Sequence, residues 1–178
     1  PVLSRGLGDV YKRQGDDNQF LGMLGMHGTY EANNAMHDCD LMINIGARFD
    51  DRITGKIDEF SPKSKKVHID IDPSSINKNV KVDLAIVGDV KTVLSSTLKS
   101  LKQKKSKFLK SNKQKTSKWW EKIQKWRSVR SLDYIGSEET IKPQYAIERL
   151  YELTKDKDSY ITTEVGQHQM WAAQHYKF

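Results

Sequence analysis

The sequence predicts an α/β fold built on a partial, doubly wound parallel sheet. Residues 20–101 alternate between short apolar runs and stretches whose apolar side chains recur with helical spacing. Each apolar run ends at a glycine or an aspartate, residue types typical of the loop that follows a strand. Strands that alternate with helices in this way favour a parallel sheet covered by helices. Only about three strands are recognisable, so we expect half of a doubly wound domain.

The first predicted elements are a glycine-rich turn and a helix. Gly22, Gly25 and Gly28 can adopt positive φ and let a ligand approach the backbone closely, because glycine has no Cβ. Cys39 is the only cysteine in the sequence, so an intrachain disulfide is excluded. A single cysteine fits a protein of the reducing cytoplasm, and we expect the Cys39 side chain to be buried. The helix is predicted over residues 29–39, with one apolar face formed by Ala32, Ala35, Met36 and Cys39.

Three strands and a further helix are predicted downstream. The strand segments are residues 41–45, 66–71 and 84–87, and we expect the first of them to be buried. Asp89 follows the third strand and can cap the next helix. The apolar stripe of that helix consists of Val90, Val93, Leu94, Leu98 and Leu101.

The basic residues are concentrated in one segment. The chain has a net charge of +7, yet residues 99–130 hold 13 Lys or Arg side chains and a single acid, Glu121. Residues 99–118 are rich in Lys, Ser and Gln, so we expect a solvated linker or a frayed helix there. An amphipathic helix that packs on another part of the protein is predicted next, from Trp119, Trp120, Ile123 and Trp126.

The same segment leaves a nucleic-acid-binding module open as an alternative. Phosphate binding by its lysines would weaken steeply with added salt. However, the tryptophans cluster at one end instead of alternating with the lysines, as a stacking platform would require. We therefore favour packing for these aromatic side chains.

No run of 18 apolar residues is present, so we expect no membrane-spanning helix.

Residues 141–178 are predicted to begin a second α/β domain. A turn at residues 133–137 precedes Pro143, which suits the first turn of a helix. Residues 160–165 are predicted to form a strand that ends at Gly166, and a helix begins at Gln167. The buried stripe of the helix after Pro143 is expected to consist of Ala146, Ile147, Leu150 and Tyr151.

Polar side chains follow the predicted strands, at the edge where α/β sheets bind ligands. Arg48 lies in the loop after the first strand, and its planar guanidinium suits a pyrophosphate or a carboxylate. Asp70 lies near the end of the second strand, where a carboxylate can accept hydrogen bonds from ribose hydroxyls. From the residues alone, a surface ion-pair cluster, a turn or a helix cap remains open for these side chains, and His27 would be a structural histidine.

Several motifs carry a resemblance to a known family. They occur collinearly from about Phe20 to Phe178, and in order they are FLGMLGMHGTYEANNAMHDCDLMINIGARFDDR, KKVHIDIDPSSINKNV, AIVGDVK, IKPQ and EVGQHQMWAAQHYKF. Together they resemble the large, catalytic subunits of the acetolactate synthase (acetohydroxyacid synthase) family, which use thiamine diphosphate and FAD. A related thiamine-diphosphate enzyme of the glyoxylate carboligase or pyruvate oxidase type is the closest alternative.

The resemblance implies a domain organisation for the chain. Residues 15–101 correspond to the C-terminal half of the central FAD-binding domain, and residues 102–140 to a basic linker with an amphipathic helix. Residues 141–178 correspond to the start of the C-terminal thiamine-diphosphate-binding domain. Residues 1–14 do not resemble the family, and we expect them to be non-native. The chain is thus expected to be an internal fragment of a large subunit.

The resemblance also implies which residues contact cofactors. It places Gln167 and His168 at the diphosphate end of thiamine diphosphate, and Asp51 and Arg52 at the mouth of the substrate channel. It implies no catalytic residue and no metal ligand in this chain, because the activating glutamate and the Mg²⁺ motif of the family lie in other segments. The implied FAD contacts are Gly25, Met26, His27, Gly28, Gly46, Ala47, Arg48, Phe49, Asp50, Asp70, Ile71, Asp89 and Val90.

The activity that the resemblance implies belongs to the parent protein. Members of the family condense two pyruvates, or pyruvate and 2-oxobutyrate, to 2-acetolactate or 2-aceto-2-hydroxybutyrate with release of CO₂, in branched-chain amino-acid biosynthesis. They are homodimers or tetramers with a small regulatory subunit. We expect a bacterial cytoplasmic protein that binds neither nucleic acid nor membrane. We also expect the fragment alone to be inactive.

Overall fold

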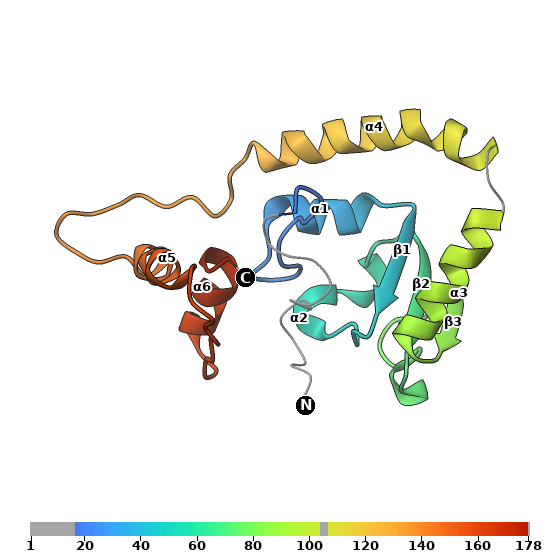
Figure 1. The fold of residues 1–178 in the computed structure, drawn as a ribbon, viewed down its shortest axis with the longest axis horizontal. Helices are drawn as coiled ribbons and strands as arrows, with labels where there is room; N and C mark the ends of the chain where they lie inside the picture. Colours follow the sequence, from blue (N-terminus) through green and yellow to red (C-terminus); the bar gives the residue numbers. More distant parts are fainter. Residues whose placement is uncertain (1–16, 104–106, 178) are drawn as a thin grey trace.

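The computed structural model describes residues 17–103 and 107–177 (Figure 1). The predicted non-native segment 1–14 lies outside the described residues. In chain order the elements are α1 (Tyr30–Asp38), β1 (Leu41–Ile45), α2 (Asp51–Thr54), η1 (Ile57–Glu59), β2 (Lys65–Asp70), η2 (Pro73–Ser75), β3 (Leu84–Val87), α3 (Val90–Gln103), α4 (Lys107–Arg127), α5 (Pro143–Thr154) and α6 (Gln167–His175).

The three strands form one parallel sheet in the order β1-β2-β3. The α/β fold and all three predicted strands are confirmed, and only β2 differs, beginning and ending one residue earlier than predicted. Pairing Asn44 with His68 and Ile43 with Val67 puts alternate side chains of neighbouring strands on a common face. One face packs on a small core of Phe49, Phe60 and Val80.

The prediction that β1 is buried is wrong. Leu41 and Ile43 are 51% and 55% exposed. β1 lies at an edge of the sheet, and α3 packs on the neighbouring β2 instead. An apolar run fixes the tendency to form a strand, but its burial depends on which elements cover it.

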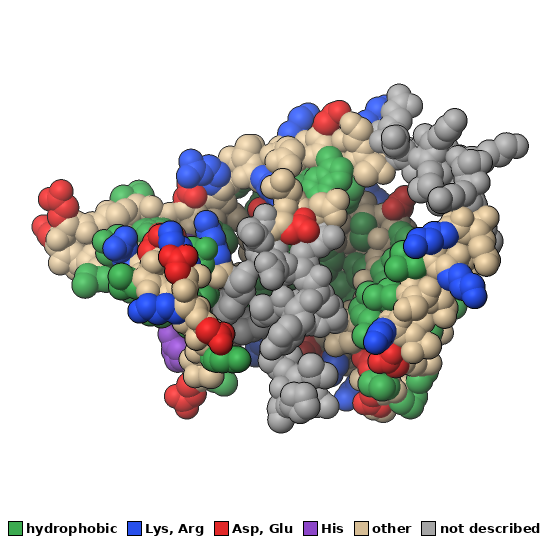
Figure 2. Space-filling view, viewed as in Figure 1, with side chains coloured by type: hydrophobic (Ala, Val, Ile, Leu, Met, Phe, Trp, Pro, Cys, Tyr) green, Lys and Arg blue, Asp and Glu red, His purple; other side chains and the backbone are tan. Residues whose placement is uncertain are grey.

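The apolar stripes predicted for residues 90–101 and for the helix after Pro143 lie on α3 and α5, yet most of their side chains are exposed. No residue of α3 is fully buried, and Figure 2 shows apolar side chains gathered over α3 and β3. The prediction of a buried stripe on α5 is wrong, since Ala146 and Leu150 are exposed while Ile147 and Tyr151 are half-buried. Among the described residues α5 packs mainly on α6, and one short helix covers only part of its surface.

The predicted strand at residues 160–165 is also wrong. This segment has no regular secondary structure, and Tyr160 and Val165 are each 87% exposed. A strand needs a neighbour to satisfy its backbone groups, and no strand lies beside this segment in the described part of the chain. Of the expected second α/β domain, the structure contains the helix pair α5 and α6.

The aromatic residues of the basic segment pack as predicted. α4 lies alongside α1 in Figure 1, Ile123 is 2% exposed, and Trp119 and Trp126 form an edge-to-face pair with centroids 5.7 Å apart.

The predicted turn at residues 133–137 is irregular backbone, and the turns lie at 128–129 and 131–132. No helix within residues 17–103 and 107–177 combines the length and the apolar character that crossing a bilayer requires.

Candidate functional site

Two backbone hydrogen bonds bring the loops after all three strands to one edge of the sheet. The N–H of Gly46, directly after β1, donates to the carbonyl of Ile69 in β2 (2.8 Å). The N–H of Gly88, directly after β3, donates to the carbonyl of Asp70 (2.9 Å). The three polar loops therefore meet at the carboxyl ends of the parallel strands, where α/β sheets bind ligands.

The loop after β1 is held in an unusual backbone conformation. Phe49 has a φ of 52°, which is costly for a residue with a side chain, and it is 6% exposed. The side-chain amide of Asn79 donates to the carbonyls of Arg48 and Phe49, each at 3.1 Å. The Phe49 ring packs edge-to-face on Phe60 in the core. Of the expected FAD contacts, Phe49 therefore presents only backbone groups to the strand-end surface.

The charged residues of this loop lie at the surface. Nη2 of Arg48 is 2.9 Å from Oδ2 of Asp50, and about half of each side chain is exposed. Such an exposed ion pair contributes little to stability. The guanidinium keeps further N–H donors for a phosphate or carboxylate. Asp51 and Arg52 follow in α2 and are also exposed.

The glycine-rich turn before α1 is clamped by one side chain. Oδ1 of Asn33 accepts from the N–H of Gly25 (2.8 Å), and its Nδ2 donates to the carbonyl of Gly25 (2.9 Å). The N–H of Met26 donates to the carbonyl of Arg52 (2.8 Å), which joins the turn to α2. Gly25 has a φ of 92°, and a Cβ there would overlap the Arg52 carbonyl, so the position requires glycine.

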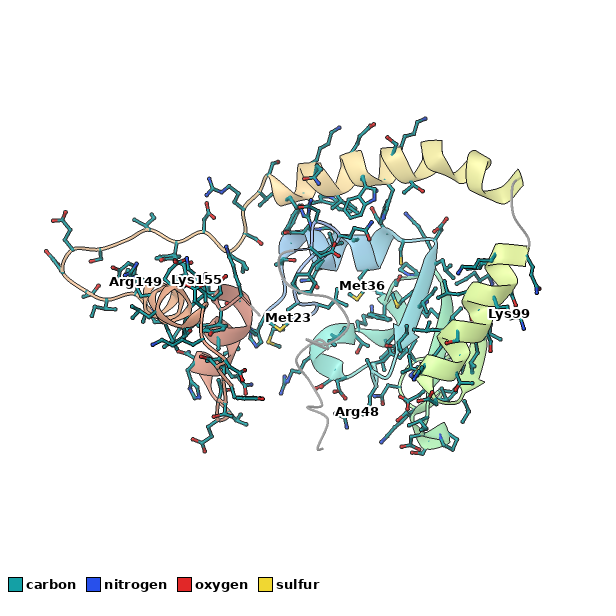
Figure 3. The ribbon with its side chains drawn as sticks, in the orientation of Figure 1. Met23, Met36, Arg48, Lys99, Arg149 and Lys155 are labelled. Carbon is teal, nitrogen blue, oxygen red and sulfur yellow. The ribbon has the colours of Figure 1, made fainter. Side chains whose placement is uncertain are left out.

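The far side of the same turn contacts α6. A Cβ at Gly28 would overlap the carbonyl oxygen of Met23, so the turn is tightly closed. The carbonyl of His27 accepts a hydrogen bond from Nε2 of Gln174 (2.7 Å), although the two residues are 147 positions apart. Figure 3 shows Met23 on the side of α6 and Arg48 beyond the tip of β1. The turn thus lies between the loop after β1 and the last turn of α6.

The other end of α6 carries the two residues expected to contact thiamine diphosphate. α6 begins at Gln167, after Gly166, and both Gln167 and His168 are exposed. The imidazole of His168 lies against the backbone of Gly166. The first N–H groups of a helix and its dipole favour anions, so this end of α6 can accept a phosphate group.

β2 ends with a carboxylate, Asp70, that is partly tethered by the loop that follows. Oδ1 of Asp70 accepts from the N–H of Asp72 (2.9 Å), and its side chain is 10% exposed. Oδ2 of Asp70 lies 3.7 Å from Nε2 of His68. The neighbouring Ile71 is 72% exposed. The carboxylate is thus positioned by its own loop and lies at the sheet edge.

Asp89, in the loop after β3, caps α3. Its Oδ1 accepts from the N–H and from the hydroxyl of Thr92, at 3.0 and 3.1 Å. The hydrogen bond from the Thr92 N–H is the main reason that the pKa of Asp89 is lowered below its usual value. The predicted cap is confirmed. Val90 begins α3 and is 37% exposed.

Three residues that shape this site were not identified from the sequence: Asn33, Asn79 and Gln174. Asn33 lies inside α1, and asparagine is a poor helix former, so its presence next to Asn34 mid-helix was an available signal. Asn79 and Gln174 act on residues about 30 and 147 positions away, and no local pattern marks such contacts.

A second polar cluster lies away from the strand ends. Oε2 of Glu148 accepts from the hydroxyl of Tyr134 (2.7 Å), and Oε1 lies 3.1 Å from Nδ1 of His175. The hydrogen bond to Glu148 raises the pKa of Tyr134 to about 12. This cluster ties the segment between α4 and α5 to the pair α5–α6. Nowhere in the described part of the chain do three His, Cys, Asp or Glu side chains gather as metal ligands would.

Comparison with known proteins identifies relatives over about nine tenths of the chain. Residues 13–97 match the family described as the thiamine pyrophosphate enzyme, central domain. The chain is 49% identical over 162 residues to the acetolactate synthase large subunit of Haemophilus influenzae, an alignment that covers 91% of this chain and 27% of the relative. It is 48% identical over 160 residues to the acetolactate synthase isozyme 3 large subunit of Escherichia coli, covering 90% and 27%.

A more distant relative gives the same result. The acetolactate synthase large subunit of Porphyra purpurea is 45% identical over 163 residues, which cover 91% of this chain. The chain spans about a quarter of the length of the curated relatives that it matches.

Proposed function

Since the chain belongs to the thiamine pyrophosphate enzyme family and is homologous to acetolactate synthase large subunits, we propose that it is a segment of such a subunit. The parent condenses two pyruvates, or pyruvate and 2-oxobutyrate, to 2-acetolactate or 2-aceto-2-hydroxybutyrate and releases CO₂. The observation that carries the proposal is the 45–49% identity to acetolactate synthases along about nine tenths of the chain. Bound thiamine diphosphate supplies the electron sink for this chemistry, and the protein binds and orients it.

FAD is proposed to bind along the edge where the strand-end loops meet. The glycine turn supports this, because the hydrogen bond from the N–H of Met26 to the carbonyl of Arg52 holds it beside α2, next to the loop after β1. The exposed guanidinium of Arg48 suits the pyrophosphate, and the carboxylate of Asp70 suits ribose hydroxyls. The full set of proposed contacts is Gly25, Met26, His27, Gly28, Gly46, Ala47, Arg48, Phe49, Asp50, Asp70, Ile71, Asp89 and Val90, with Phe49 and Asp89 contributing backbone groups.

The remaining ligands are assigned to the edges of this region. Gln167 and His168 are proposed to hold the diphosphate end of thiamine diphosphate, which fits their position at the start of α6. Asp51 and Arg52 are proposed to line the substrate channel, which fits their exposure beside the glycine turn. Mg²⁺ is proposed to bind in the parent through residues of other segments.

The biological setting follows from the same assignment. We propose that the parent works in branched-chain amino-acid biosynthesis in a bacterial cytoplasm, as a homodimer or tetramer with a small regulatory subunit. The fragment alone is proposed to be inactive, because the activating glutamate and the metal ligands of the family lie in other segments.

Product analysis of a full-length protein carrying this sequence tests the proposal. Supplied with pyruvate, thiamine diphosphate, Mg²⁺ and FAD, it is expected to form 2-acetolactate and CO₂ without bleaching the flavin absorbance. Flavin bleaching by pyruvate with no acetolactate would overturn the assignment in favour of a pyruvate oxidase type. Turnover of glyoxylate alone would favour a glyoxylate carboligase. Turnover by residues 1–178 on their own would contradict the proposed inactivity of the fragment.

A further inference from the structure

The most unusual side chain near the strand ends is a buried histidine. His68 lies in β2 and is 0% exposed. Neither of its ring nitrogens has a hydrogen-bond partner among the described residues. Leaving a buried donor or acceptor unpaired costs free energy, and native proteins rarely tolerate it without a reason. We therefore looked for a group that could hydrogen-bond to this imidazole. His68 is not one of the proposed cofactor contacts.

A carboxylate oxygen close to His68 belongs to Asp70, the last residue of β2 and a proposed nucleotide contact. Residues 68 and 70 lie on the same face of β2, because side chains alternate along a strand. Nε2 of His68 is 3.7 Å from Oδ2 of Asp70, which is about half an ångström beyond a good hydrogen bond. The other carboxylate oxygen, Oδ1, is already held by the N–H of Asp72. A small rotation of the carboxylate would close the remaining gap.

The imidazole itself is fixed in place. Its ring packs edge-to-face on Phe49, with centroids 5.3 Å apart and an interplanar angle of 78°. Phe49 is in turn held by Asn79 through its backbone carbonyl. His68 therefore lies between Phe49, in the loop after β1, and Asp70, at the end of β2, and packing holds its ring there.

We propose that His68 is a positioning residue for Asp70: its Nε2–H donates to Oδ2 of Asp70 when the carboxylate accepts the adenosine ribose hydroxyls of FAD. The inference rests on the proposed function, in which Asp70 contacts the nucleotide. A carboxylate has about four acceptor sites on its two oxygens. With one taken by Asp72 and one by His68, the carboxylate is fixed at both oxygens and keeps acceptor sites for the ribose.

The test is FAD binding by a full-length protein that carries this sequence, measured by quenching of flavin fluorescence at fixed pH and salt. His68→Leu removes the donor at similar volume, and FAD affinity is expected to fall about tenfold. His68→Gln returns an amide N–H near the Nε2 position, and its affinity is expected to stay within about threefold of the unmutated protein. His68→Asn, whose amide ends near the Nδ1 position, should not reach Asp70 and should lose affinity like the leucine variant.

Two further comparisons separate positioning from packing. FMN lacks the adenosine, so His68→Leu should leave FMN affinity unchanged. The double variant His68→Leu/Asp70→Asn should bind FAD only slightly more weakly than Asp70→Asn alone, because both changes remove the same interaction. Ile69→Val is the matched control, since it alters a buried side chain of the same strand on the opposite face.

The inference is overturned if His68→Gln loses as much affinity as His68→Leu, if FAD and FMN weaken equally, or if the two losses simply add. Should His68→Leu fail to fold, the contrast between His68→Gln and His68→Asn decides the same question. A different result would sink the proposed function instead: an unmutated protein that binds no FAD. The two failures are therefore distinguishable.

Discussion

The side-chain amide of Asn33 makes two hydrogen bonds with the backbone of Gly25: it accepts from the N–H at 2.8 Å and donates to the carbonyl at 2.9 Å. The side chain replaces the hydrogen bonds that a strand or helix would give this residue. It allows a turn with φ of 92° to persist next to α2. The shape of the proposed flavin site therefore depends on a residue that need not contact the flavin.

Asn33→Ala is expected to weaken FAD binding about tenfold and to lower stability by about 1–3 kcal/mol, because the Gly25 N–H loses its partner and the Gly25 carbonyl keeps only the N–H of Gly28. Flavin titration and thermal unfolding of the full-length protein measure the two effects. Asn34→Ala is the matched control. Asn34 is the next residue of α1, and its side-chain amide donates to the carbonyl of Tyr30 in the same helix, so its replacement should change neither quantity appreciably. Equal effects of the two variants would contradict the role of the clamp.

Asn79→Ala should destabilise the loop after β1. Asn79 is the side chain that holds Phe49 at a φ of 52°, and without it this backbone can relax. We expect a loss of about 1–2 kcal/mol in stability and weaker FAD binding, since the position of Arg48 depends on the same hydrogen bonds. Lys78→Ala, an exposed neighbour, serves as the control. A loss of stability with unchanged flavin affinity would contradict the proposed role of this loop in binding the cofactor.

Acid should weaken the sheet region through two carboxylates. Lys65 lowers the pKa of Asp83 through a side-chain hydrogen bond, and Thr92 lowers that of Asp89, both from an ordinary value of 3.8. A carboxyl whose folded pKa is lowered stabilises the fold above its unfolded pKa, and this contribution is lost as the pH falls through the folded pKa. The melting temperature should therefore drop as the pH falls below about 3.8, and Asp83→Asn with Asp89→Asn should flatten that drop. An unchanged acid profile in the double variant would contradict this account.

Tyr134 should titrate abnormally at high pH. Its hydrogen bond to Glu148 raises its pKa from 10.0 to about 12. Because the folded pKa is the higher one, the stabilising contribution is complete below pH 10 and is lost as the pH rises toward 12. Tyrosinate absorbance should show one late-titrating tyrosine that Glu148→Gln shifts to lower pH. Glu152→Gln is the control, because Glu152 lies on the same helix but pairs with Lys155. A late tyrosine that persists in Glu148→Gln would contradict the assignment.

Local patterns predicted the parts of the fold that local physics decides. β1 and β3 begin and end where their apolar runs do, and Asp89 caps α3, because propensity, glycine and hydrogen-bonding side chains act over a few residues. The loops that follow the strands meet at one edge because a parallel sheet leaves them no other arrangement.

The features that the sequence did not predict depend on contacts between residues that are far apart in the chain. Residues 160–165 have strand-like composition, but no strand lies beside them in the described part of the chain. Leu41 is apolar yet exposed, because nothing in the described structure covers that part of the sheet. Gln174 reaches His27 only after the whole chain has folded, so no window of sequence could reveal that contact.

The most direct test of the central claim, that the strand-end loops and the glycine turn hold a flavin nucleotide, is an FAD titration of the full-length apoprotein with two glycine variants. Gly25→Ala should abolish saturable binding, because its Cβ would overlap the Arg52 carbonyl at a φ of 92°. Gly136→Ala should bind like the unmutated protein, because a methyl group added there would meet no atom within 4 Å. Saturable FAD binding that Gly25→Ala leaves intact, or no binding by the unmutated protein, would contradict the claim.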